Sequence, residues 1–198
     1  MQQAMSYLTG LAGLAVLWIV LLIATRKHPW SLVIGEDGRP STSKFQMLVW
    51  TAAVVFAFLA IYQVRFSSGY RDELPGVPTN LLIAMGISVA TAVSAKSIAV
   101  KSAAAIAAAP APLVAPPRSK SGIFSDDFGL PDLGKVQVVL WTAIAVGVFL
   151  AEVFAVISCP SCPPNSVSKL GLPDIGQTLM ILMGLGHGAY IGKKIAES

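Results

Sequence analysis

Five apolar stretches constrain the fold of this chain more than any other feature of its sequence. Each is around 20 residues long, the length at which a helix crosses a hydrocarbon core of about 30 Å. Charged residues make up only 12% of the chain, against about 25% in an ordinary soluble domain, and no stretch shows the wide polar face of a soluble helix. The sequence therefore predicts an all-α integral membrane protein with five transmembrane helices, approximately at 7–25, 45–64, 79–99, 136–157 and 177–196.

The positive charges predict the orientation of these helices in the membrane. Eleven of the 14 Lys and Arg residues fall in one set of alternate loops and three in the other. Because cytoplasmic loops carry the excess of positive charge, the N-terminus is expected outside and the C-terminus inside. No positive charge precedes the first stretch, and "TRKHPW" follows it, which favours a retained helix over a cleaved signal. No basic patch interleaved with aromatic residues points to nucleic acid as a partner.

An internal repeat organises the rest of the chain. "KFQMLVWTA" at 44–52 returns as "KVQVVLWTA" at 135–143, a shift of 91 residues, and 11 of 25 positions are identical between 36–60 and 127–151. Further matches, such as Leu74-Pro75 with Leu172-Pro173, occur at a shift of 98. A fixed period indicates a duplicated unit, here a helical hairpin. Both copies are expected to run in the same direction, related by an axis along the membrane normal.

The repeat also predicts how the chain divides. We expect an N-terminal transmembrane helix at 1–30, a first hairpin at 31–109, a linker at 110–125 and a second hairpin at 126–198. The linker is rich in Ala and Pro, which favours an extended connector. On the cytoplasmic side, residues 110–134 could bind a soluble partner.

The repeated residues have two possible roles. Lys44 and Lys135 are expected at headgroup level as interface anchors, with Trp50 and Trp141 deeper, in the aromatic belt. Gln46 and Gln137 lie four residues before these Trp residues, on the same helix face. The repeated group either anchors and starts two helices, or lines an inner vestibule with its Gln side chains.

Small residues recur at every fourth position of the two return helices. In lipid, such stripes allow helix backbones to approach closely. We therefore expect these helices to meet each other or the helices of neighbouring copies, which predicts a homo-oligomer. The residues are Gly86, Ala90 and Ser94 in the first copy, and Gly184, Gly188 and Gly192 in the second.

The two cysteines, Cys159 and Cys162, form "CPSC" in the loop expected outside. In an oxidising compartment they would form a structural disulfide that closes the loop. A redox-active pair is the alternative, although no second cysteine pair is present to relay electrons. Two ligands are too few for a zinc site, so no metal is expected.

Two ionisable residues fall inside predicted spans, where charge is costly and points to function. His187 lies mid-helix and Glu152 toward the outer end of the fourth stretch. Val89 and Ile61 hold the matching places in the first copy. Together with Gln46 and Gln137, they could form a polar path, or His187 could be a hydrogen-bonded packing residue. No haem or other cofactor is expected, because His28 lies at the inner interface and no other intramembrane His is present.

"EDGRPSTSKFQMLVWT" and "MGIS" at 85–88 resemble motifs of uncharacterised bacterial multi-span membrane proteins. The resemblance covers about half of the chain, implies the bacterial inner membrane as location, and implies no activity. No nucleophile with a base, phosphate loop or carboxylate pair indicates an enzyme. The expected function is a non-enzymatic channel, pore or transport subunit in contact with lipid. The alternatives are a membrane scaffold and a thiol oxidoreductase that uses Cys159 and Cys162.

Overall fold

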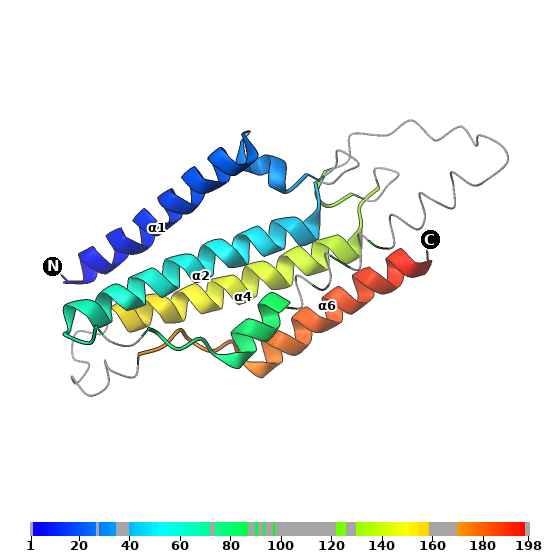
Figure 1. Cartoon of the computed structure of the whole chain (residues 1–198). Helices are drawn as coiled ribbons and strands as arrows, with labels where there is room; N and C mark the ends of the chain where they lie inside the picture. Colours follow the sequence, from blue (N-terminus) through cyan, green and yellow to red (C-terminus); the bar gives the residue numbers. More distant parts are fainter. Residues whose placement is uncertain are drawn as a thin grey trace, which may run out of the picture.

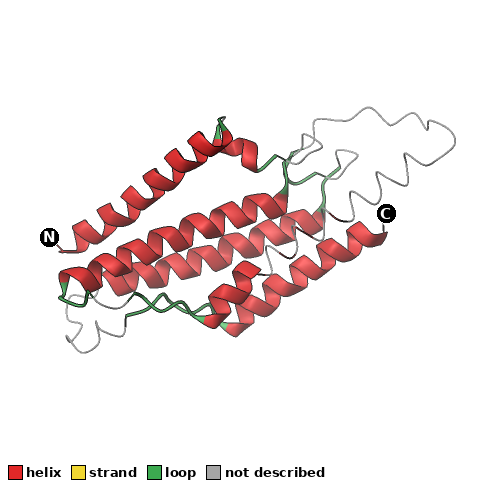
Figure 2. Ribbon diagram, viewed as in Figure 1, coloured by secondary structure: helices red, strands yellow, loops and turns green. Residues whose placement is uncertain are grey.

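The computed structural model describes residues 2–26, 28–34, 40–71, 74–86, 122–125, 130–158 and 170–196, together with positions 90, 93 and 97. Over these ranges the protein consists of helices and connecting loops (Figure 2), which confirms the all-α class. The long helices are α1 (Gln2–Thr25), α2 (Thr42–Ser67), α4 (Leu133–Ile157) and α6 (Gln177–Ala196), and a 3-10 turn, η1 (Pro29–Leu32), follows α1. Residues 79–86 are also helical.

Three of the described helices, α1, α2 and α4, are long and apolar enough to cross a membrane. This supports the prediction of a membrane protein, whereas the count of five spans stays a prediction. Cys159, Cys162, Ser94 and the linker residues 110–121 lie outside the described residues.

The long helices lie roughly parallel to one another as an elongated bundle (Figure 1). Helices α2 and α4 lie side by side and run in the same direction, whereas α1 and α6 run in the opposite direction. The two chain termini therefore lie at opposite ends of the bundle. The two helices that carry the "K-x-Q-x-x-x-W-T-A" pattern thus start at the same end.

The residues that lead into α2 and α4 make the same two contacts, and equivalent residues are 91 positions apart. In each copy a lysine ammonium donates to the carbonyl ten residues earlier. The residue before the helix donates its N–H to the carbonyl eight residues earlier. In the first loop these contacts are Lys44 Nζ to Ile34 O (2.9 Å) and Ser41 N to Val33 O (2.7 Å). In the second they are Lys135 Nζ to Ser125 O (2.5 Å) and Asp132 N to Phe124 O (2.8 Å). The repeated lysines therefore make equivalent contacts before α2 and α4.

The N-terminal caps of α2 and α4 differ in the number and length of their hydrogen bonds. The Asp132 carboxylate accepts from Gly134 N at 2.9 Å and Lys135 N at 3.3 Å, whereas the Ser41 hydroxyl accepts from Lys44 N at 3.5 Å. Replacing a good cap by Ala costs about 0.5–2 kcal/mol. We expect Asp132→Ala to lower the free energy of unfolding in detergent by more than Ser41→Ala does. Equal effects of the two variants in thermal denaturation would contradict this assignment.

The core lies where α2 and α4 meet. Trp50 on α2 and Phe149 on α4 are both buried and make a T-shaped contact with ring centroids 6.0 Å apart. Small side chains around them, such as Ala57 and Ala145, let the helix backbones approach closely. The bundle interior is therefore filled by aromatic and aliphatic side chains along most of its length.

At the other end of the bundle, the chain segments before the two return helices lie against each other. Leu172 N donates to Gly76 O at 2.9 Å, and Asn80 Nδ2 donates to Asp174 Oδ2 at 2.9 Å. A Cβ atom on Gly171 would lie 3.0 Å from Gly76 O, so a side chain there would press on the Gly76 backbone. These contacts join the segment that follows α2 to the segment that precedes α6.

Candidate functional site

A buried polar pair joins α6 to α2. His187 Nε2 of α6 lies 2.7 Å from Gln46 Oε1 of α2, and the two residues are 141 positions apart in the sequence. His187 Nδ1 lies 2.6 Å from the Met183 carbonyl, one turn earlier in α6. Both side chains are buried, so the pair is closed off from solvent.

The hydrogen-bond chemistry of this pair fixes the state of the imidazole. Both ring nitrogens of His187 face oxygen atoms that only accept, whereas a neutral imidazole carries a single N–H. Either His187 is doubly protonated, or the Gln46 amide is turned so that its nitrogen donates to His187 Nε2. A cation buried between apolar helices is costly, and the oxygen and nitrogen of an amide are interchangeable in shape. The turned amide with a neutral His187 is therefore the favoured arrangement.

A second observation supports the turned amide. With Gln46 Oε1 facing His187, the Gln46 Nε2 and Trp50 Nε1 atoms are buried donors without an acceptor. Turning the amide gives Gln46 Nε2 the imidazole as its acceptor. It also leaves the Gln46 oxygen free to accept, and the Trp50 indole lies one helical turn along the same face of α2. A buried donor without a partner costs about 1–3 kcal/mol, so this orientation is the more stable one.

Helix α6 contacts both repeated helices at this depth. While His187 reaches Gln46 on α2, the neighbouring Gly186 packs against α4: a Cβ atom there would lie 3.6 Å from Trp141 Cδ1 and 3.8 Å from Gln137 Cγ. Gln46, Gln137 and Trp141 therefore lie near one segment of α6. Their environments differ, because Gln46 is buried and Gln137 is only half-buried.

The structure does not bring all four predicted polar residues together. Gln46 and His187 are paired, and Gln137 lies near them on α4. Glu152 lies 15 residues further along α4 than Gln137 and is exposed. Trp50 was expected in an interfacial belt, but it is buried against Phe149, because the approach of α4 covers this side of α2. The structure thus shows Gln46 as a tie between helices.

The stripe of small residues faces outward in the described chain. Gly86, Ala90, Gly188 and Gly192 are exposed, and Gly184 is half-buried. A Cβ atom on Gly86, Gly184, Gly188 or Gly192 would meet no other atom within 4 Å. The stripe is therefore not used for packing among the described parts of this chain.

Sequence reasoning missed one buried charge. Arg65, near the end of α2, is buried and donates through Nη1 to Leu170 O at 2.9 Å. It lies within the last turn of α2, and its counterpart in the second copy is Val156. The sequence held one indication of this buried charge: a cation at the end of a long apolar helix that the second copy lacks.

The described residues contain no group of three or more His, Cys, Asp or Glu side chains that could hold a metal ion. The chain matches no protein-family model, no curated protein and no solved structure. The resemblance to bacterial multi-span proteins therefore stays a prediction from the sequence.

Proposed function

We propose that this chain is a non-enzymatic, five-span protein of the bacterial inner membrane that assembles from several copies into a channel, pore or transport unit. Its N-terminus would lie outside and its C-terminus inside. The three long apolar helices support the membrane location, and the excess of positive charge in alternate loops supports the orientation.

The observation that carries this proposal is the outward-facing stripe on α6. Gly188 and Gly192 are exposed and have open space where a side chain would lie. Small residues at this spacing allow close helix contact in lipid, and no described part of the same chain occupies the position. The buried Gln46–His187 pair closes the interior of a single copy at that depth, so a path for solutes would run between copies.

Reconstitution into liposomes tests this function. We expect the wild-type protein to be oligomeric in mild detergent and to pass ions or small solutes. Gly188→Leu should reduce both the oligomer and the flux, because the larger side chain prevents close helix approach between copies. Its matched control is Ala12→Leu, at a position on α1 that is also exposed, which should leave both unchanged. Tight liposomes containing an intact oligomer would contradict the proposal.

A membrane scaffold is the second candidate, and exposed apolar side chains near the starts of α2 and α4 favour it. They are Trp30, Leu32, Phe124, Leu130 and Leu133. Such side chains can bind a partner protein at the membrane surface. If the chain is a scaffold, replacing the exposed Phe124 and Leu130 by Ser should release a soluble partner while the helical core stays folded.

A further inference from the structure

Equivalent faces of the two repeated helices have opposite environments. Four residues of α2 form what we call the leading face, and their equivalents on α4, 91 positions later, are all buried. Met47 is 42% exposed whereas its equivalent Val138 is 2% exposed, and the remaining three are half-buried on α2. The leading face consists of Met47, Thr51, Phe58 and Tyr62; the buried equivalents are Val138, Thr142, Phe149 and Val153.

The opposite holds for a second face, which we call the trailing face of α4. Ile144 and Val148 are 39% and 42% exposed, whereas their equivalents on α2, Ala53 and Ala57, are 6% and 0% exposed. The trailing face consists of Ile144, Val148, Ala151 and Glu152; the buried equivalents are Ala53, Ala57, Ala60 and Ile61.

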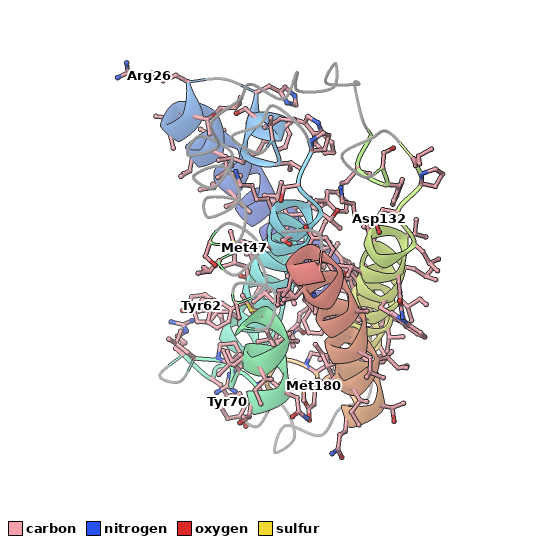
Figure 3. The ribbon with its side chains drawn as sticks, turned by 90° about the vertical axis from the view of Figure 1, so that its right-hand side faces the viewer. Arg26, Met47, Tyr62, Tyr70, Asp132 and Met180 are labelled. Carbon is pink, nitrogen blue, oxygen red and sulfur yellow. The ribbon has the colours of Figure 1, made fainter. Side chains whose placement is uncertain are left out.

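These burial patterns indicate that α2 and α4 meet through non-equivalent faces, which is a head-to-tail contact. Phe149, one of the residues equivalent to the leading face, makes the contact with Trp50 on α2, whereas Val138 lies beside Gly186 of α6. In Figure 3, Met47 and Tyr62 lie on the side of α2 away from α4, so α4 does not cover the leading face. Because this contact joins two different faces, the leading face of α2 and the trailing face of α4 are left unused. Further copies can bind through these two faces until a ring closes.

We propose that the trailing face of one copy binds the leading face of the next, so that the chains form a ring around an axis along the membrane normal. The proposal rests on the proposed function, which requires an oligomer. The occupant is a second copy of this chain because a contact of this kind, in which Phe149 of α4 meets Trp50 of α2, already exists inside the chain. The new interface thus continues an interface that the fold already contains.

Glu152 gives this joint a specific polar contact. It holds the place that Ile61 holds on α2, and Tyr62 holds the place of Val153 on α4. The two side chains therefore lie at the same depth on the faces that meet. A carboxylate exposed on an apolar helix is costly in lipid, and the Tyr62 hydroxyl is a donor that can satisfy it. The register also places Trp141 against Phe58 of the next copy, as Trp50 lies against Phe149.

Disulfide cross-linking between two tagged chains tests the joint. Both chains carry Cys159→Ser and Cys162→Ser; one also carries Glu152→Cys and the other Tyr62→Cys. A disulfide forms only where Cα atoms come within about 4.4–6.8 Å. We expect oxidation to link the two tagged chains when they are expressed together. As a matched control, Glu152→Cys should not link to Leu8→Cys, an exposed position on α1.

The possible outcomes distinguish failure of this interface from failure of the proposed function. Glu152→Cys linking to itself shows a symmetric α4–α4 contact and overturns the head-to-tail joint. An oligomer in mild detergent without a link between Glu152→Cys and Tyr62→Cys also overturns the joint, but it leaves the proposed function standing. A monomer at every detergent and protein concentration overturns both. A link between the mixed chains, together with loss of oligomer in Glu152→Leu, supports the joint.

Discussion

The His187→Leu variant should unfold at a markedly lower temperature than the wild-type protein in detergent. Leucine is large enough to occupy the space, but it leaves the Gln46 amide buried without its partner. A buried polar group that loses its hydrogen bond costs about 1–3 kcal/mol, and α6 loses the side-chain bond that ties it to α2. Gln46→Leu should have a similar effect, because it leaves the imidazole without the partner of its Nε2 atom.

A double-mutant cycle measures the pair itself. The double variant Gln46→Leu/His187→Leu should be less destabilised than the sum of the single variants, with a coupling of about 0.5–3 kcal/mol. The matched control is Gln137→Leu, the same substitution at the equivalent, half-buried position of the second copy. It should change the free energy of unfolding by about 0.5 kcal/mol or less. Additive effects at Gln46 and His187 would show that the pair does not join α6 to α2.

The second large effect is expected at Gly10 of α1. A Cβ atom at this position would lie 2.7 Å from Phe56 Cδ2 and 3.1 Å from the Phe56 carbonyl oxygen. Neither a buried ring nor a backbone atom can move aside without shifting α2. Overpacking of this kind costs about 1–3 kcal/mol or more. We therefore expect Gly10→Val to separate α1 from α2 and to lower the unfolding temperature.

Gly13 and Ala12 of the same helix are comparison positions for Gly10. At Gly13 the closest atom is the end of the Leu59 side chain, at 2.1 Å from the added Cβ, and that flexible end can rotate away. Gly13→Val should therefore be milder than Gly10→Val. Ala12→Val, on the exposed side of the same helix, should be close to neutral. Equal stability of the Gly10 and Ala12 variants would contradict the packing of α1 on α2.

The helix positions were predictable from hydrophobicity, although the helix ends were not. The stretch 45–64 predicted a helix that the structure extends to Thr42–Ser67. Thr42 and Ser43 are polar, so hydropathy excludes them, yet they are buried and helical because Ser41 caps the helix just before them. At the start of α4 the structure likewise adds Leu133 to Lys135 ahead of the predicted 136, behind the Asp132 cap.

The sequence also indicated which residues in the candidate site needed partners, since a Gln or His within an apolar helix is costly unless it is hydrogen-bonded. It could not indicate that Gln46 and His187 meet each other. Any of the polar residues at a similar depth could have been the partner, and the repeat itself gave no hint, because His187 has Val89 as its counterpart.

By itself, the sequence determined that this chain forms long apolar helices, and that two of them start with the same repeated motif and run in the same direction. These properties follow from residue type and local spacing, which act within a few residues along the chain. Only the tertiary structure decided that α6 contacts both repeated helices, that Gln46 is sealed against His187, and that α2 and α4 bury different faces. Those outcomes depend on how helices rotate about their own axes when they pack, and side chains distant in sequence jointly set that rotation.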